Sequence, residues 1–480
     1  MVKRGKKFHH HFKKRGRPVG SRKRSKKYIP HLLKGMKDIL PEEQKYFDFV
    51  LDKTKEVARA YGFEKVTLPL VEELNLFKRG VGLTTDIFQR ELFNFNTPSG
   101  QKVCLRPEGT ASSVRAYLEH GFFNLPQPVK LFYDGPMFRY EKIETGKQRE
   151  FYQIGLEVIG SSKSVIDAQL ILLVSNLLQN LGLKHTIQIN NLGCEECRKI
   201  YQRKLTDFIK QKFYLFCKDC RRRARRSPLR LFECHTKSCR DIFSQAPHLV
   251  DFLCEECRSQ FIKTLELLDE ARVVYNLNLY LVRGMAYHDK TIFEFWPIRP
   301  NKPKEIAEKP VDDKTLDKKD VKTDEKVKSQ IEEEIDSRSA LAGGGRYDRL
   351  VKALGGQMTP MCGVALGLER IVDEMKKNQV KLPKTRTPQV FVAQIGDLAR
   401  QNALRIFEIV RKEGFRVAEN LSQDSLRNQL DIANKLGVKY CLILGQQEVL
   451  HKTIIIRDMN SGSQETIDQE KILKELRKRL

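Results

Sequence analysis

Eight of the eleven cysteines in this 480-residue chain lie between Cys194 and Cys257, in four close pairs. The pairs are Cys194/Cys197, Cys217/Cys220, Cys234/Cys239 and Cys254/Cys257; three are C-x-x-C, and the remaining one is C-H-T-K-S-C. A two-residue gap lets both thiolates of a pair reach one tetrahedral Zn²⁺ from a tight turn, and two such pairs complete a Cys₄ site. The spacing therefore predicts a small module held together by one or two zinc ions.

Two other interpretations of these cysteines stay open, namely disulfides and plain thiols in a helical module. Disulfides are the weaker one, because the N-terminus has no apolar signal-peptide core and a reducing compartment keeps thiols free. The run R-R-R-A-R-R, Arg221–Arg226, lies between the second and third pairs. Such a cluster suits phosphate contacts, although a solvated basic face explains it equally well.

The length of the chain favours several domains, since one core rarely serves more than about 250–300 residues. Apolar residues make up 40% of the chain, which is enough for packed cores. No apolar run reaches the roughly 18 residues needed to span a bilayer, so we expect a soluble, cytoplasmic protein and no membrane partner. The formal net charge of +27 indicates a polyanionic partner.

The basic charge is concentrated in residues 1–30, which contain thirteen Lys/Arg and no acid. We predict that this tail is disordered and that it serves as an electrostatic arm for nucleic acid. The run R-G-R-P at Arg15–Pro18 resembles an AT-hook core, but one short match in a Lys-rich tail is too little to expect DNA as the partner. The tail makes a poor transit peptide, and an organelle destination stays open.

A second charged stretch, Asn301–Ala340, contains ten Lys/Arg, twelve Asp/Glu and no aromatic residue. It cannot bury enough surface to fold, so we predict a disordered insertion over about residues 301–338. Apolar sequence resumes on both sides, and the insertion therefore interrupts a domain. The segment K-L-P-K-T-R-T-P at Lys381–Pro388 is typical of a linker between domains.

Three separated stretches have the features of a nucleotide site. The first contains F-R-Y-E at Phe138–Glu141 and R-E-F-Y-Q-I-G-L-E-V-I-G at Arg149–Gly160. Phe132–Tyr140 and the alternating Ile154, Leu156 and Val158 predict an antiparallel strand pair joined by the loop Lys142–Gln148. G-V-A-L-G-L-E-R-I at Gly363–Ile371 predicts a strand followed by a helix that carries an arginine. A-G-G-G-R-Y-D at Ala342–Asp348 has three glycines, which permit close backbone approach to a ligand.

Together these stretches resemble the class II aminoacyl-tRNA synthetases, and within them the histidyl-tRNA synthetase family, from about Leu33 to the C-terminus. The matching segments are Gly35–Pro41 (the family's opening), Val66–Glu72 (motif 1), Leu105–Thr110 (the amino-acid pocket), Phe138–Glu141 with Phe151–Gln153 (motif 2), Gly367–Arg370 (motif 3), and Leu281–Gly284 with Gly343–Asp348 (the two histidine-specific signatures). The Cys-rich module resembles the family's inserted domain, although many relatives lack most of these cysteines.

The resemblance implies an α+β catalytic domain with an antiparallel class II sheet over residues 31–384, with a helical Cys-rich insertion at about 190–270. It also implies a C-terminal α/β anticodon-binding domain over 387–480 and a homodimer formed through motif 1 around Pro69. In the last domain we predict strands at 390–393, 415–418, 440–444 and 452–458 and helices at 398–413 and 424–436, hence a mostly parallel sheet.

The implied reaction joins L-histidine to ATP as histidyl-adenylate and then transfers the histidyl group to histidine tRNA, with Mg²⁺ on the phosphates. The catalytic residues implied by the resemblance are Arg139 and Arg283 at the α-phosphate and Arg370 at the γ-phosphate. The implied histidine-binding residues are Glu108, Thr110, Arg139, Gln153, Glu157, Arg283, Tyr287, His288 and Tyr347. The implied ATP-binding residues are Arg139, Glu141, Lys147, Phe151 and Arg370.

The chain departs from the family pattern at several positions. R-G-M-A-Y-H at Arg283–His288 replaces the usual R-G-L-D-Y-Y, so Ala286 loses a carboxylate and His288 replaces a pocket tyrosine. Lys147 stands where arginine is usual and lacks its bidentate fork. These changes leave open a non-charging paralogue that acts as a regulatory or nucleic-acid-binding protein. The C-terminal domain argues against that alternative, since regulatory paralogues characteristically lack it.

Overall fold

The computed structural model divides into two compact units, with the boundary in the chain between Val380 and Lys381. The described residues are 29–82, 85, 87–143, 148–225, 227–234, 236–300, 333–335, 340–383 and 387–480. Among these residues, no helix has the length and apolar character needed to cross a membrane.

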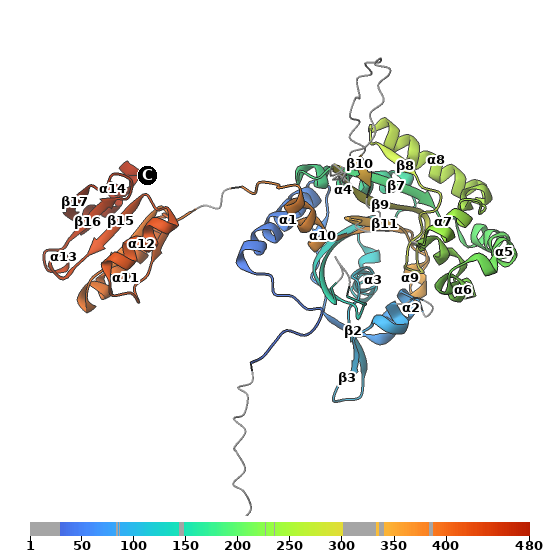
Figure 1. Ribbon diagram of the computed structural model, residues 1–480, viewed down its shortest axis with the longest axis horizontal. Helices are drawn as coiled ribbons and strands as arrows, with labels where there is room; N and C mark the ends of the chain where they lie inside the picture. Colours follow the sequence, from blue (N-terminus) through green and yellow to red (C-terminus); the bar gives the residue numbers. More distant parts are fainter. Residues whose placement is uncertain are drawn as a thin grey trace, which may run out of the picture. The chain divides into compact units, whose positions relative to one another are not determined.

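A large, mostly antiparallel sheet forms the centre of the first unit (Figure 1). Its strands are β1 (Glu64–Lys65), β5 (Val129–Phe138), β6 (Glu150–Ile159), β7 (His185–Asn191), β8 (Tyr275–Leu277), β9 (Asp289–Pro300), β10 (Glu333–Ile335), β11 (Ala342–Arg346) and β12 (Met361–Gly367). Their order is β1-β5-β6-β12-β11-β9-β7-β8, with β10 paired to β9. Only β1 with β5 and β7 with β8 run parallel among the described pairs, so the predicted antiparallel sheet is confirmed.

The strands β5 and β6 form the predicted antiparallel pair, in register from Val129 opposite Ile159 to Phe138 opposite Glu150. Every residue of β6 from Ile154 onward is buried, because the sheet is covered on both faces. Helix α4 (Ser164–Asn180) supplies part of that cover and buries a continuous apolar face.

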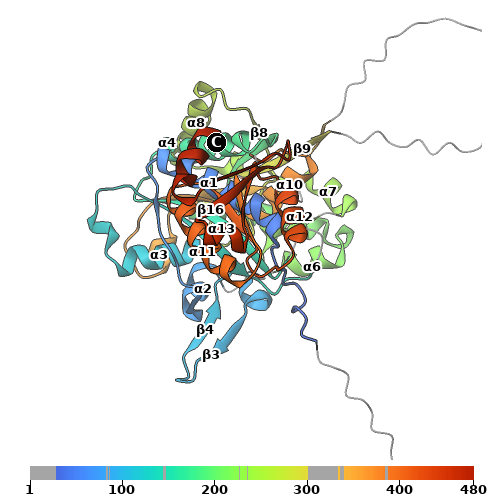
Figure 2. The ribbon, with the colours of Figure 1, turned by 90° about the vertical axis from the view of Figure 1, so that its left-hand side faces the viewer.

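The remaining elements of this unit border the sheet. They are α1 (Pro41–Ala60), β2 (Val71–Glu73), α2 (Leu74–Gly80), the π-helix η1 (Ile87–Glu91), β3 (Asn94–Asn96), β4 (Lys102–Leu105), α3 (Thr110–Glu119), η2 (Phe122–Asn124), α9 (Leu350–Ala353) and α10 (Leu368–Lys377). The β3–β4 hairpin projects from the body of the unit (Figures 1 and 2). The predicted strand-to-helix passage at motif 3 is confirmed as β12 followed by α10.

The Cys-rich module is inserted between β7 and β8 and is helical, as predicted. Its elements are α5 (Glu195–Gln211), η3 (Phe213–Leu215), α6 (Lys218–Ala224), η4 (Pro228–Glu233), α7 (Lys237–Phe243), η5 (Leu249–Phe252) and α8 (Glu255–Glu270). It has a small apolar core of its own, which includes Tyr201, Leu205, Phe216 and Phe243.

Two predicted disordered segments fall largely outside the described residues: the tail, described only from residue 29, and most of the charged insertion at 301–338. Within that insertion, Glu333–Ile335 forms β10, which pairs antiparallel with Ile298–Pro300 of β9. This short strand extends the sheet. The charge content of the insertion gave no indication of a strand there.

The second unit is an α/β sheet with helices. Its elements are β13 (Val390–Gln394), α11 (Asp397–Lys412), β14 (Val417–Glu419), α12 (Leu426–Leu436), β15 (Tyr440–Leu444), α13 (Gln446–Leu450), β16 (Thr453–Asp458), β17 (Gln464–Asp468), η7 (Gln469–Lys471) and α14 (Ile472–Arg479). The order is β14-β13-β15-β16-β17.

The prediction of a mostly parallel sheet is right for only one side of this unit. Strands β14, β13 and β15 are parallel, whereas β16 and β17 join them antiparallel. A parallel crossover needs about a dozen residues or more, and the connection after β15 contains only the short helix α13. The chain therefore returns beside β15 in the opposite direction.

Candidate active site

A cavity of about 390 Å³ brings together residues from β6, β11 and β12, the start of α3 and the segment before β9. The predicted residues that line it are Glu108, Thr110, Arg139, Glu141, Phe151, Gln153, Arg283, Tyr287, His288, Tyr347 and Arg370. Glu157 lies directly behind this wall, and Lys147 is outside the described residues. Segments up to about 260 residues apart in the chain thus converge on one site.

Glu157 is fully enclosed by hydroxyl groups. Its carboxylate accepts hydrogen bonds from the Thr110 hydroxyl at 2.8 Å, from the Tyr133 hydroxyl at 3.3 Å and from the Tyr347 hydroxyl. Burial raises its pKa to about 8. Gly363 on β12 leaves room for this arrangement, because a Cβ there would lie 2.0 Å from the Glu157 carboxylate. Glu157 therefore acts on the cavity through the hydroxyls that it orients.

Glu108 is the second buried carboxylate of the site. It lies before α3 and accepts the backbone N–H groups of Thr110 at 2.6 Å and Ala111 at 2.9 Å. Burial raises its pKa, whereas the positive end of the helix favours its charged form. The carboxylate is thus fixed beside the cavity, where a cationic ligand group would meet it.

Three aromatic rings close the same side of the cavity. The rings of Tyr287 and His288 have centroids 4.9 Å apart, and Tyr347 meets them at 5.3 and 5.5 Å. Burial, with a contribution from Arg283, holds the pKa of His288 well below its usual range, so the imidazole is neutral. We call Glu108, Glu157, Tyr287, His288 and Tyr347 the carboxylate side of the pocket.

The three predicted catalytic arginines form the other side, which we call the arginine side. Arg139 donates from Nε to the Pro107 carbonyl at 2.9 Å. Arg370, on α10, donates to the Ala340 carbonyl at 2.9 Å, and burial lowers its pKa. Arg283 forms an ion pair with Glu294 of β9. Three cations share one cavity, an arrangement that suits a polyphosphate.

The glycines of β11 leave space for neighbouring protein atoms as well as for the cavity. A Cβ on Gly343 would lie 2.2 Å from Arg283 Nη1, so this glycine makes room for the guanidinium. A Cβ on Gly344 would lie 2.2 Å from Gly363 O of β12, and a Cβ on Gly345 would lie 2.5 Å from Thr291 O, beside Ile292 of β9. The predicted close approach to the β11 backbone is confirmed, but the atoms that approach the glycines belong to Arg283 and to the adjacent strands.

Several pocket residues escaped the sequence analysis: Lys37, Glu43, Gln148, Glu294, Glu369 and Asp373. Glu369 accepts the Tyr152 backbone N–H at 2.7 Å, and burial raises its pKa to about 7. Glu294 and Trp296 lie on one face of β9, where Trp296 Nε1 donates to Glu294 at 2.8 Å. The alternation of Glu294 and Trp296 with the apolar Phe293 and Phe295 is the sequence signal that could have placed Glu294 and Trp296 on one face of a strand.

The eight paired cysteines form two separate clusters. Cys194, Cys197, Cys254 and Cys257 form the root cluster, and Cys217, Cys220, Cys234 and Cys239 form the distal cluster. Within each cluster the sulfur atoms all lie within 4.8 Å of one another. All eight are free thiols in the structure, so the disulfide interpretation gains no support.

Comparisons with known proteins agree with this geometry. Residues 35–308 match the family model described as histidyl-tRNA synthetase, and residues 389–479 match that of an anticodon binding domain. A histidine–tRNA ligase from Thermosipho melanesiensis is 36% identical over 442 residues, which are 92% of this chain and 97% of the relative. The chain belongs to the histidyl-tRNA synthetase family.

Further relatives support this membership. A histidine–tRNA ligase from Aquifex aeolicus is 37% identical over 440 residues, covering 91% of this chain and 98% of the relative. The crystal structure of the apo histidyl-tRNA synthetase of S. aureus superposes with a TM-score of 0.71 at 28% identity, covering 93% of this chain and 99% of that one. As in these family members, the class II catalytic sheet and the C-terminal domain occur in one chain.

Proposed function

We propose that this chain is a histidine–tRNA ligase, which joins L-histidine to histidine tRNA at the expense of ATP. The observation that carries the proposal is a single cavity with two buried carboxylates and three aromatic rings on one side and three arginines on the other. The C-terminal unit, which matches an anticodon binding domain, also favours a charging enzyme over a regulatory paralogue. Membership in the family supports the same function.

In the first step the histidine carboxylate attacks the α-phosphorus of ATP. An oxygen–phosphorus bond forms, the bond to the bridging oxygen breaks, and pyrophosphate leaves with that electron pair. Arg139 and Arg283 would neutralise the charge that develops on the α-phosphate, and Arg370 would hold the γ-phosphate. Such positioned cations supply most of the catalysis of phosphoryl transfer.

In the second step the terminal adenosine hydroxyl of histidine tRNA attacks the acyl carbon and AMP leaves. The C-terminal unit, which matches an anticodon binding domain, would bind the other end of the tRNA. The tail at residues 1–30 would add an electrostatic arm. A chain lacking that tail should show weaker tRNA binding with a smaller salt dependence; unchanged values would refute the arm.

On the carboxylate side, Glu108 would meet the α-ammonium group of histidine, and Thr110 and Gln153 would assist it. The imidazole would pack against Tyr287, His288 and Tyr347. The hydroxyls that donate to Glu157 keep lone pairs that could accept an imidazole N–H, and amino acids without a polar ring cannot supply that hydrogen bond. The adenine would lie at Glu141 and Phe151, and Lys147 would contact the phosphates.

ATP with Mg²⁺ is expected for this family. Mg²⁺ prefers carboxylate and phosphate oxygens, and Glu369 and Asp373 offer carboxylates in the cavity wall beside Arg370. These donors fit the ion, which would neutralise phosphate charge when bound.

We also propose one structural Zn²⁺ in each cysteine cluster. Tetrahedral coordination at about 2.3 Å places thiolate sulfurs about 3.8 Å apart, and Cys194 Sγ lies 3.5 Å from Cys197 Sγ and Cys217 Sγ 4.0 Å from Cys234 Sγ. Backbone N–H groups already point at the sulfurs, as from Cys254 to Cys197 Sγ at 3.1 Å. Metal analysis of purified protein should find about two zinc ions per chain; none in a folded chain would refute the sites.

A homodimer in the cytoplasm completes the proposal. Leu70 and Val71, beside Pro69 in the motif 1 segment, are 43% and 44% exposed, an apolar surface that a second copy could cover. Light scattering should give twice the chain mass.

The direct test is ATP–pyrophosphate exchange with purified, metal-replete protein. We expect exchange that requires L-histidine and is not supported by L-alanine, followed by charging of histidine tRNA. Absence of exchange would favour the non-charging alternative and overturn the proposed function.

A further inference from the structure

The root and distal clusters differ in their connection to the pocket. The root cluster joins the first turn of α5, where the Cys-rich module leaves the catalytic sheet after β7, to the first turn of α8, the helix that leads back to β8. The distal cluster joins α6 and α7 with the segment after η4, entirely inside the module. Among the described residues, the root cluster is the one whose neighbours hydrogen-bond to the segments that carry His288 and Tyr347. The distal cluster comes near the cavity through Glu233, the neighbour of Cys234, which would lie 3.7 Å from a Cβ on Gly284.

The shortest path runs along the backbone. Gly193, which precedes Cys194, accepts the backbone N–H of Lys290 at 3.1 Å, and the Lys290 carbonyl accepts from Leu192 at 2.7 Å. Lys290 is two residues after His288. Gly193 has a φ of +61°, and a Cβ there would lie 2.5 Å from Cys197 Cβ, so the turn fits only with glycine and with the cluster close behind it.

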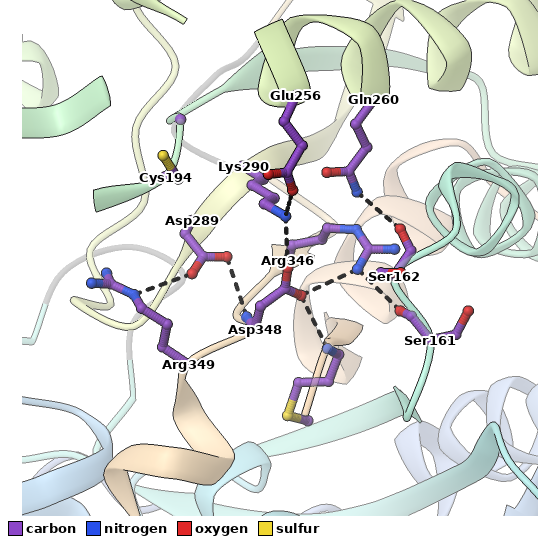
Figure 3. A network of polar contacts seen from close by, with 12 residues as sticks. Ser161, Ser162, Cys194, Glu256, Gln260, Asp289, Lys290, Arg346, Asp348 and Arg349 are labelled. Carbon is purple, nitrogen blue, oxygen red and sulfur yellow. Dashed lines mark hydrogen bonds and ion pairs between the residues drawn. The ribbon is translucent and has the colours of Figure 1, made fainter. Parts of the chain in front are cut away.

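A second path leaves from α5 itself. Arg198, one turn after Cys194, donates from Nη1 to the backbone carbonyl of His288 at 3.0 Å. Glu195 pairs with Arg349 at 3.0 Å, and Arg349 Nε lies 3.4 Å from Asp289, the neighbour of His288 (Figure 3). Helix α5 is thus connected at two points to the segment that carries the His288 ring.

A third path leaves from α8. Glu256 contacts Lys290 Nζ at 3.2 Å, and the same Nζ contacts Asp348 at 3.2 Å (Figure 3). Asp348 is the neighbour of Tyr347, and it also meets Arg346 at 3.2 Å. Arg346 is fully buried with Asp167, so this end of the network is rigid.

The energies of these links are unequal. Glu195 and Glu256 have side chains that are 57% and 80% exposed, and exposed ion pairs contribute little. The backbone bonds of Lys290 and the half-buried Arg198 bond are better shielded from water and therefore dominate. Their geometry depends on how α5 is anchored at its first turn, where a metal ion would bind.

We infer that a Zn²⁺ ion in the root cluster positions His288 and Tyr347, so that loss of this ion weakens histidine binding while loss of the distal ion does not. The inference rests on the proposed function and adds to it a division of labour between the two clusters. His288 and Tyr347 remain the residues that touch substrate; Cys194, Cys197, Cys254, Cys257 and Arg198 are positioning residues.

The test compares two matched variants, Cys254→Ser in the root cluster and Cys234→Ser in the distal one. For each, zinc content is measured by mass spectrometry, the Kd of L-histidine by calorimetry, and KM for ATP by exchange. We expect each variant to lose about one zinc ion. In Cys254→Ser the histidine Kd should rise about tenfold, within the range of such couplings, with KM for ATP within about twofold.

Cys234→Ser should bind histidine within about twofold of the wild type. A Cys254→Ser chain that lacks the ion yet binds histidine normally would overturn the inference alone, as would equal losses of affinity in both variants. A wild-type chain that does not bind histidine would refute the proposed function as well.

A third variant guards against misfolding of Cys254→Ser. Arg198→Met leaves both clusters intact, so it should keep two zinc ions and still weaken histidine binding, and Arg198→Lys should restore part of the affinity. Unchanged histidine affinity in Arg198→Met would overturn the proposed path.

Discussion

The charged groups on the carboxylate side of the pocket are buried acids, whereas those on the arginine side are guanidiniums. Arg139 and Arg370 donate to backbone carbonyls, and Arg283 pairs with Glu294. Glu108 and Glu157 are almost wholly buried, and burial raises the pKa of both. Arg139 and Arg283 keep about a fifth of their side-chain surface exposed. One side is therefore built to enclose its ligand, and the other keeps its charge accessible.

This difference separates affinity from rate. Hydroxyls and rings fixed around buried acids discriminate between amino acids already in the ground state. The arginines interact most strongly with the phosphate when negative charge develops on it, so they stabilise the transition state more than the ground state. Rate and affinity should therefore separate best at Arg370 and Glu157, since, in addition to burial, Arg283 lowers the pKa of His288.

The largest effect should come from Arg370→Gln on the arginine side. We expect kcat for ATP–pyrophosphate exchange to fall about 10²–10³-fold, because one cation on the phosphates is lost. The KM for histidine should stay within about threefold. Arg59→Gln, at an exposed site on α1, is the control and should leave both constants unchanged. A loss confined to the KM for histidine would contradict the division between the two sides.

Gly343→Ala should act on the same side without removing a charge. The added Cβ would displace the Arg283 guanidinium, and misplacing a catalytic group by about 1 Å costs about 10²-fold in rate. Gly284→Ala is the matched control, since its Cβ meets nothing closer than Glu233 at 3.7 Å. Steady-state exchange kinetics measure both variants; equal rates for the two would show that Arg283 needs no such space.

Glu157→Gln should affect the carboxylate side and chiefly raise the KM for histidine, by about tenfold. Measured above about pH 8, where Glu157 is ionised, the carboxylate accepts the hydroxyls of Thr110 and Tyr347 on its two oxygens, whereas the amide accepts with one atom only. One buried hydrogen bond is then lost, about 1.5 kcal/mol. The kcat should change by less than about threefold. A large fall in kcat at unchanged KM would place Glu157 in the chemistry instead.

The smallest effect concerns pH and stability. The pKa of Glu157 rises from its ordinary 4.5 to about 8 on folding, so the folded state binds the extra proton between these values. Its contribution to stability is complete below about pH 4.5 and is lost as the pH rises to about 8, by at most about 1.4 kcal/mol per pH unit.

From pH 6 to 8 the Tm of the wild type should therefore fall about 2–5 °C more than that of Glu157→Gln. Calorimetry of both chains at several pH values measures the difference between them. Parallel curves would mean that Glu157 titrates normally in the folded chain.

The sequence predicted most of the arginine side and less of what supports it. Local strand and helix patterns grouped the stretches around Arg139 and Arg370 into one site, and the family resemblance added Arg283; all three line one cavity, while their roles stay predictions. Glu294, which pairs with Arg283, was missed because a pairing between the segment before β9 and β9 itself depends on how the chain turns back. The position of Glu157 behind Thr110 and Tyr347, rather than in the cavity wall, likewise required three-dimensional packing.

The fold shows the same limit. Local apolar patterns predicted α11 and the β5–β6 pair to within a few residues. The direction of β16 was wrong because it is set by the length of a connection, and β10 was missed because its composition resembles that of a disordered segment. Four cysteine pairs were visible in the sequence, but which pairs share a cluster was not.

The three glycines of β11 differ in what a geneticist could recover from them. At Gly343 the obstacle to a larger residue is a side chain, so a second mutation that shortens Arg283 would relieve the clash, but at the cost of a proposed catalytic group. At Gly344 and Gly345 the obstacle is the backbone of the adjacent strands, which no amino-acid substitution removes. A screen for intragenic suppressors that selects for growth should therefore return none at any of the three positions, whereas a screen that scores folding should recover shortened Arg283 alleles for Gly343 alone.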